Sequence, residues 1–190
     1  MEKNKKLRLL VTGKCPNNCP LCCNKNFRLK DIPVVERWDY DEIMITGGEP
    51  LLFPWKMEYL VKSIRRVTEA MGRNPKIYVY TSVCEADKVK RTVNIVDGIV
   101  LTPHTKNDLA YFKQLNNVVL REWWGFTHYG EKDPSLRLNV FPEIKDFLPE
   151  NLKRWKVKEV EWQENCPVPE GEDFCRLADL WVEDKYESNW

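Results

Sequence analysis

The chain has 190 residues, of which 43% are hydrophobic and 31% are charged, and its formal net charge is +1. This size and balance are typical of one globular domain with its own hydrophobic core. With a net charge this close to zero, the chain has no strong electrostatic field to recruit nucleic acid or an acidic membrane surface. No apolar run reaches the roughly 18 residues of a membrane span, and the charged N-terminus has too short an apolar run for a signal peptide. We therefore expect a single cytoplasmic domain over residues 1–190, with reduced cysteines and no membrane or nucleic-acid partner.

Short β-rich segments alternate with helical patterns along the chain. Strands are predicted at residues 7–13, 42–48, 76–82, 98–104, 117–124, 136–142 and 157–164, and helices at 55–72, 85–96 and 106–115. Gly72 suits the C-terminal end of the first helix. The tail from residue 166 is expected to be irregular and then briefly helical.

This alternation predicts βα units around a parallel sheet, and therefore an α/β fold. A complete eight-unit barrel usually needs at least about 200 residues. Five or six units fit this length, so we expect an open or partial barrel. Residues from about 143 to 190 are expected to form a short C-terminal extension that packs on this core.

Unusual polar residues collect where the predicted strands end. Parallel α/β sheets bind ligands at the carboxyl ends of their strands, so these residues are expected to share one site. In chain order they are a cysteine-rich loop, the segment Thr46 to Pro50, Thr81 with Ser82, Thr102 with His104, and Arg121.

The cysteine-rich loop reads "VTGKCPNNCPLCCNK" and places Cys15, Cys19 and Cys22 at C-x3-C-x2-C spacing, with Cys23 beside the third. A structural zinc site usually takes four ligands from two separated pairs, and no second CxxC follows. Iron–sulfur clusters are commonly held by closely spaced thiolates, and three thiolates leave one iron open. The spacing favours an iron–sulfur cluster, with zinc and packing or redox thiols as alternatives.

The motif GGEP has chemistry of its own. Gly47 and Gly48 let a ligand approach the backbone, because they lack side chains. Glu49 supplies an acceptor suited to an ammonium group, and Pro50 fixes the exit of the chain. Alone, the motif is equally consistent with a tight strand-to-helix turn, but its position one βα unit after a three-cysteine loop is more specific.

With C-x3-C-x2-C after the first strand and GGEP after the second, the sequence resembles the radical S-adenosylmethionine (SAM) superfamily from about Leu7 to Pro142. The family often has an aromatic residue before the third cysteine, where this chain has Leu21. The resemblance implies a partial (βα)6 barrel and a [4Fe–4S] cluster on the three cysteines. The amino and carboxylate groups of SAM would chelate the open iron.

The resemblance also implies roles for individual residues. Gly47, Gly48 and Glu49, flanked by Thr46 and Pro50, would accept hydrogen bonds from the SAM amino group, and the backbone near Leu21 would contact the adenine. The other candidates for binding SAM are Thr81, Ser82, Thr102 and, for its carboxylate, Arg121. The candidate catalytic residues are His104, Arg121 and Cys84.

The remaining cysteines have structural alternatives. Cys84 is a hydrogen donor or ligand on one reading and a semi-buried structural thiol on the other. Cys23 is expected to be a packed thiol beside the cluster. Cys166 and Cys175 are expected to be structural or redox thiols, with ligands of an auxiliary cluster as the alternative.

The reaction implied is reductive cleavage of SAM to a 5′-deoxyadenosyl radical, which abstracts hydrogen from an unidentified small-molecule or nucleoside-like substrate. The electron would come from a flavodoxin or ferredoxin type of partner. The alternatives are an activating enzyme that installs a glycyl radical on a partner protein, a peptide-modifying enzyme, and a non-catalytic metal-binding interaction protein.

Overall fold

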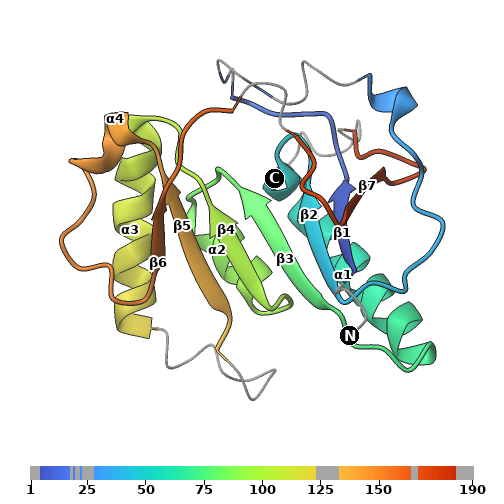
Figure 1. The fold of residues 1–190 in the computed structure, drawn as a ribbon. Coiled ribbons are helices and arrows are strands. Elements are labelled where there is room, and N and C mark those ends of the chain that lie inside the picture. The colour runs from blue at the N-terminus through green and yellow to red at the C-terminus, as the bar shows by residue number, and fades with distance from the viewer. Residues whose placement is uncertain are drawn as a thin grey trace.

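The computed structural model describes residues 5–17, 19, 22, 28–122, 133–163 and 167–182. Their strands form one parallel sheet in the order β6-β5-β4-β3-β2-β1-β7, which stays open because β6 and β7 are its edges (Figure 1). The α/β class, the parallel pairing and the open sheet confirm the coarse prediction. The strands are β1 (Lys6–Leu10), β2 (Glu42–Thr46), β3 (Lys76–Thr81), β4 (Gly98–Leu101), β5 (Ser135–Val140), β6 (Lys156–Glu159) and β7 (Glu172–Arg176).

The helices connect the strands and cover one face of the sheet. They are α1 (Pro54–Ala70), α2 (Ala86–Val93), α3 (Lys106–Glu122) and the short α4 (Pro142–Lys145), with 3₁₀ turns η2 (Leu29–Asp31) and η3 (Pro50–Leu52). Figure 1 shows α1, α2 and α3 behind the sheet. None of the described helices is both long enough and apolar enough to cross a membrane.

The core lies between the sheet and these helices. Leu7 and Leu9 of β1 are fully buried on the helix-covered side, and Arg8 between them points to the other face because side chains alternate along a strand. The same alternation places Ile77 and Val79 of β3 in the core. Burying each such aliphatic side chain stabilises the fold by about 2 kcal/mol.

Gly72 ends α1 as the sequence predicts. Its φ is +69°, in the left-handed region that favours glycine. Gly72 N donates to Glu69 O at 2.9 Å and Arg73 N donates to Thr68 O at 2.8 Å, which is the Schellman pattern.

The predicted strand at residues 117–124 is wrong, because α3 continues to Glu122. Leu109, Phe112, Leu115 and Val119 are buried at helical spacing, so packing on the core outweighs the β-propensity of the paired valines. Arg121 therefore lies in the last turn of a helix.

The prediction of an irregular, then helical tail is also wrong for the residues that the structure describes there. β7 pairs in parallel with β1, and Arg8 binds Glu172 with Nη2–Oε2 at 2.8 Å. Tyr40 Oη donates to Asp173 Oδ2 at 2.7 Å from the other side. The C-terminal region thus supplies both edges of the sheet, β6 and β7.

Candidate active site at the strand ends

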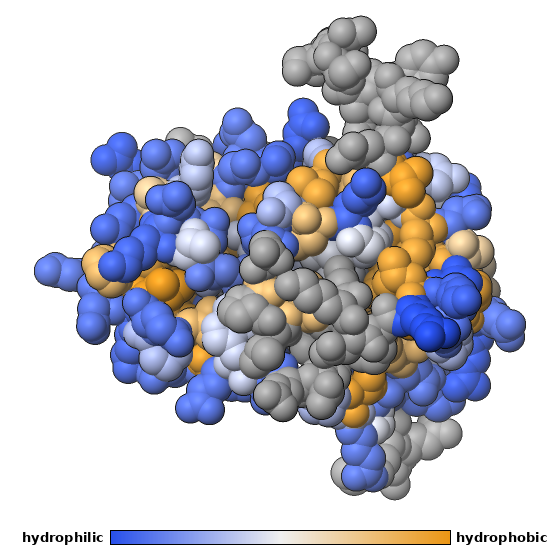
Figure 2. All heavy atoms as spheres, turned by 90° about the horizontal axis from the view of Figure 1, so that it is seen from above, coloured by the Kyte–Doolittle hydropathy of each residue, from blue (hydrophilic) through white to orange (hydrophobic). Residues whose placement is uncertain are grey.

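A cavity of about 660 Å³ lies at the carboxyl ends of the strands and extends onto the sheet face opposite the described helices. Figure 2 looks onto this end of the molecule, where apolar residues lie beside hydrophilic ones. The structure brings most of the predicted site residues to this cavity: Cys15, Cys19, Cys22, Thr46, Gly47, Gly48, Glu49, Thr81, Ser82, Thr102 and His104.

The GGEP segment packs directly against the start of the cysteine-rich loop. Gly48 N donates to Thr12 O at 2.6 Å and Glu49 N donates to Lys14 O at 2.7 Å. A Cβ on Gly48 would lie 1.9 Å from Lys14 O, and one on Gly47, whose φ is +133°, would lie 2.5 Å from Thr12 O. Both glycines are therefore required by the contact between two backbone segments.

Thr12 fixes the loop to the C-terminal tail. Its side chain is fully buried, and Oγ1 donates to Trp181 O at 2.8 Å while accepting from Lys14 N at 3.1 Å. Trp181 N donates in turn to Val11 O at 2.8 Å. The tail after β7 thereby holds the base of the cysteine-rich loop.

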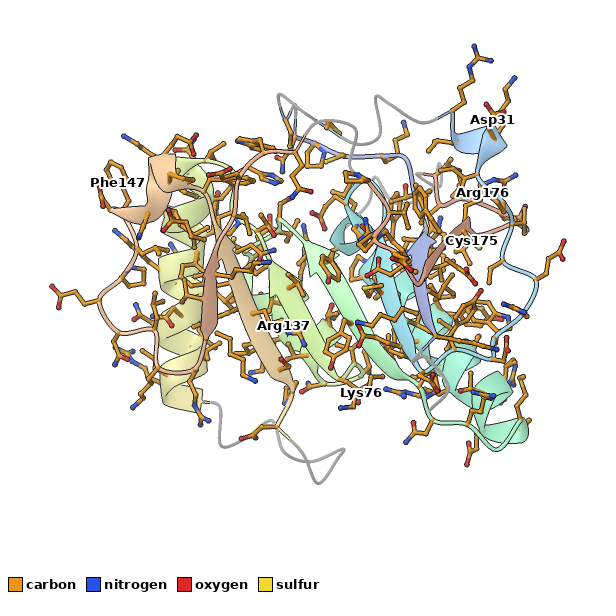
Figure 3. All side chains as sticks on the ribbon, in the orientation of Figure 1. Asp31, Lys76, Arg137, Phe147, Cys175 and Arg176 are labelled. Carbon is orange, nitrogen blue, oxygen red and sulfur yellow. The ribbon has the colours of Figure 1, made fainter. Side chains whose placement is uncertain are left out.

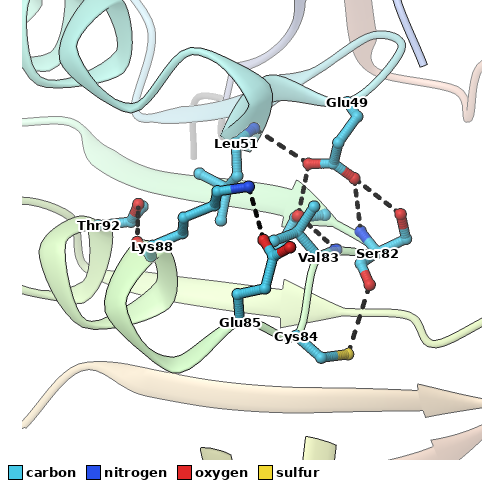
Figure 4. A network of polar contacts seen from close by, with 9 residues as sticks. Glu49, Leu51, Ser82, Val83, Cys84, Glu85, Lys88 and Thr92 are labelled. Carbon is cyan, nitrogen blue, oxygen red and sulfur yellow. Dashed lines mark hydrogen bonds and ion pairs between the residues drawn. The ribbon is translucent and has the colours of Figure 1, made fainter. Parts of the chain in front are cut away.

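The carboxylate of Glu49 joins the GGEP segment to the end of β3 (Figure 4). Oε1 accepts from Leu51 N at 3.0 Å and Thr81 Oγ1 at 2.6 Å, and Oε2 accepts from Ser82 N and Ser82 Oγ, both at 2.8 Å. The residue is 1% exposed. Four donors fill the usual acceptor positions of a carboxylate. The carboxylate therefore has no usual acceptor position left for an ammonium ligand. Among the described residues, no backbone N–H outside the helices and strands donates to the carbonyl of Gly47 or Gly48.

His104 lies beside the cysteine-rich loop. Its Nδ1 is 3.5 Å from Cys19 Sγ and 3.2 Å from Asn17 Nδ2, and Asn17 Nδ2 also donates to Ser82 Oγ at 2.8 Å. Burial lowers the pKa of His104, although the charge of Asp108 opposes this. The neutral ring is thus favoured, with Nδ1 either accepting from Asn17 or donating to Cys19.

An aromatic stack that was not predicted from the sequence lies beside the cavity, and His104 and Trp162 of this stack line it. The rings of Phe141 and Trp162 are parallel within 9° with centroids 4.0 Å apart, and the His104 ring lies 5.3 Å from Trp162. Trp162 follows β6 and lines the cavity. The predicted strand at residues 157–164 includes Trp162 but assigns it no role in the site.

The three thiols share the cavity without forming a site for a single ion. Burial raises the pKa of Cys15, against a lowering by a backbone hydrogen bond at Asn17, and the charges of Glu49 and Cys22 raise it further. Within the described part of the chain, no three His, Cys, Asp or Glu side chains are grouped to hold one metal ion. A cubane cluster differs because each thiolate binds a separate iron, so its ligands surround a volume. Cys15, Cys19 and Cys22 all line the cavity, and thiolates are the ligand type that such a cluster takes.

Three predicted residues do not line this cavity. Cys84 is buried, and its Sγ donates to Ser82 O at 3.4 Å. Burial also raises the pKa of this thiol strongly, in agreement with the structural alternative. Pro50 is buried as the first residue of η3. Arg121 is exposed at the C-terminal end of α3, so its expected position at a strand end is wrong.

Of the other cysteines, the structure describes Cys175. Cys175 lies in β7 and is partly buried against the core, and burial raises its pKa. Leu21, Cys23 and Cys166 lie outside the described residues.

The cavity also has polar residues that sequence reasoning missed: Arg8 from β1, Tyr80 from β3 and Lys158 from β6. The arginine was visible in principle, since it interrupts the apolar run of the first strand. No known family model matches the chain, and no curated protein matches it significantly.

Proposed function

We propose that this chain is a radical SAM enzyme, and that its open sheet is a partial (βα)6 barrel. The observation that carries the proposal is the joint packing of two motifs at one cavity. Cys15, Cys19 and Cys22 line the cavity together with Gly47 and Gly48, whose backbone is pressed against the loop that bears the cysteines. Each motif alone has a structural explanation, but their close packing beside a cavity supports a shared ligand site.

The three cysteines would hold a [4Fe–4S] cluster, and the backbone carbonyls of Gly47 and Gly48 would accept hydrogen bonds from the SAM ammonium group. When bound, cluster and SAM supply one-electron cleavage of the sulfonium and abstraction of a substrate hydrogen by the resulting radical. The electron would come from a flavodoxin- or ferredoxin-type partner in the cytoplasm.

The surrounding residues would orient the ligand and exclude water. Thr102 Oγ1 accepts from Asn139 Nδ2 at 3.3 Å, so its own proton is available to a ligand oxygen. Ser82 Oγ is occupied by Glu49 and Asn17, so it holds the loop and does not bind SAM through its hydroxyl. The flat face of Trp162 offers an apolar wall for a planar ring. Such a wall also keeps water from a reactive species.

Anaerobic reconstitution with iron and sulfide tests the proposal. The wild-type chain should take up about four irons and, with a strong reductant, convert SAM to 5′-deoxyadenosine. Cys19→Ala should lose both properties. Cys175→Ala is the matched control, since this thiol lies in β7 away from the cavity lining, and it should keep both. An intact cluster in the wild-type chain with no SAM cleavage would refute the proposal.

A further inference from the structure

The cavity continues below the strand ends along the uncovered face of the sheet. Arg8, Tyr80 and Lys158 line this lower part from three different strands. Asn139 is in register with Lys158 on the neighbouring strand and so shares its face. None of these residues belongs to the cysteine or GGEP motifs.

Arg8 has donor capacity to spare. Its Nη2 forms an ion pair with Glu172 Oε2 at 2.8 Å, and the Arg8 side chain remains 29% exposed. A guanidinium carries five N–H donors in a planar fork that suits two-point binding of a carboxylate or phosphate. The pair with Glu172 orients this fork and leaves other N–H groups for a ligand.

The hydroxyl of Tyr80 faces a weak hydrogen-bond acceptor. Its Oη lies 3.8 Å from Met44 Sδ, and a thioether sulfur is a poor acceptor. Burial raises the pKa of Tyr80; the charges of Arg137 and Arg8 oppose this, and those of Glu42 and Glu172 add to it. The phenol therefore stays protonated and can donate to an anion.

Lys158 lies on the opposite wall, and among the described residues no carboxylate pairs with its ammonium group. The adjacent Glu159 also borders the cavity, but it is bound by Lys145 Nζ at 2.5 Å. Glu161, just after β6, also lines the cavity and is exposed to solvent. Arg137 of β5, labelled in Figure 3, lies on the same face. Its Cζ is 4.8 Å from the centroid of the Tyr78 ring.

Arg8, Tyr80 and Lys158 thus keep hydrogen-bond donors beyond those that the described carboxylates take up. Glu49, the buried acid of the upper cavity, has its four acceptor positions filled by the chain itself. We propose that Arg8 with Tyr80 on one wall, and Lys158 on the other, bind oxyanion groups, carboxylate or phosphate, of a small-molecule substrate. Calling this ligand the substrate rests on the proposed function, whereas binding of the anion does not.

Calorimetric titration tests anion binding on the purified chain without SAM. Inorganic phosphate and succinate serve as the two probes, with sodium chloride holding the ionic strength constant. The tighter probe identifies the chemical source of the oxyanion. Lys158→Gln and Tyr80→Phe should each weaken the preferred probe by roughly tenfold, as expected for loss of a hydrogen bond to a charged group.

Lys156→Gln is the matched control, since it removes the same charge two residues earlier on β6 and outside the cavity lining. Arg8→Gln is combined with Glu172→Gln so that no carboxylate is left unpaired, and it should also weaken binding. Equal affinities for wild type, Lys158→Gln and Lys156→Gln, or no binding of either probe, would overturn the anion site.

SAM cleavage is measured separately on the reconstituted protein. Anion binding without SAM cleavage would refute the radical SAM function and leave the anion site standing. SAM cleavage in a chain that binds neither probe would support the radical SAM function and refute the anion site.

Discussion

The carbonyl oxygen of Lys14 lies 1.9 Å from the point where Gly48 would carry a Cβ. Lys14 follows β1 and Gly48 follows the adjacent strand β2. Their backbones are in contact without the help of any ligand. The glycine therefore sets how closely the cysteine-rich loop approaches the GGEP segment. This contact links a sequence motif to the position of a potential cluster.

Gly48→Ala should disturb this contact. Because the atom it meets belongs to the backbone, the loop must move, and we expect about 3 kcal/mol of destabilisation together with loss of iron uptake. Urea unfolding and iron analysis after reconstitution measure both effects. Gly72→Asn is the control, because a Cβ there meets nothing within 4 Å and asparagine tolerates its positive φ. Unchanged iron uptake in Gly48→Ala would contradict this account.

Glu49→Gln should lower the free energy of unfolding by about 2 kcal/mol, because an amide NH₂ would replace one buried acceptor among four donors. Chemical unfolding of the chain without cluster or SAM isolates this effect. Glu58→Gln is the comparison, since it alters an exposed carboxylate paired with Lys62 and should cost about 0.5 kcal/mol or less. If the Glu49 carboxylate bound a ligand and did not stabilise the chain itself, Glu49→Gln and Glu58→Gln would have the same free energy of unfolding.

Asn116→Ala should lower the free energy of unfolding by about 2 kcal/mol, because it leaves the buried Trp155 indole N–H without its acceptor and removes a second, partly buried hydrogen bond. Asn116 Oδ1 accepts from Trp155 Nε1 and Asn116 Nδ2 donates to Asn151 O, both at 3.0 Å. Asn117→Ala changes the exposed neighbour on the same helix and should be nearly neutral. Equal unfolding midpoints for the two variants would argue against the path of α3.

Tyr40→Phe should remove a pH dependence at alkaline pH. Burial and the hydrogen bond to Asp173 raise the pKa of Tyr40 to about 12, compared with about 10 in an unfolded chain. The neutral phenol thus favours the folded state, and its contribution is complete below about pH 10 and lost as the pH rises toward 12. Urea midpoints at pH 8.5 and 11.5 should differ less in Tyr40→Phe than in wild type. Tyr111→Phe, at an exposed tyrosine, should leave the wild-type difference intact.

The sequence was informative where a residue is required by its local backbone or by a repeating pattern. Gly72 was found from its position after a periodic helix, and the parallel sheet from alternating elements. The shared location of Cys15, Gly48 and His104 followed from the rule that parallel strands end at one edge. These inferences need no knowledge of long-range contacts.

The predictions that were wrong or missing concern residues whose structure depends on contacts with residues distant in the sequence. Arg121 was misplaced because the core, and not the local β-propensity, decided the path of residues 117–122. The strand character of residues 172–176 comes from pairing with β1 and from contacts with Arg8 and Tyr40. The role of Glu49 was also hidden, since its donors come from η3 and the end of β3.

The pairing of β7 with β1 also constrains how the nascent chain acquires its structure. Arg8 and Glu172 are 164 residues apart, an interval that a ribosome needs roughly 10 to 30 seconds to translate at its usual rates. Until then β1 lacks one neighbour, and an open edge of this kind is prone to pair with other chains. Trp181, which holds Thr12, arrives later still. We therefore expect the base of the cysteine-rich loop to be held in place only after synthesis of the tail, so that a cluster bound by this loop would be inserted after translation.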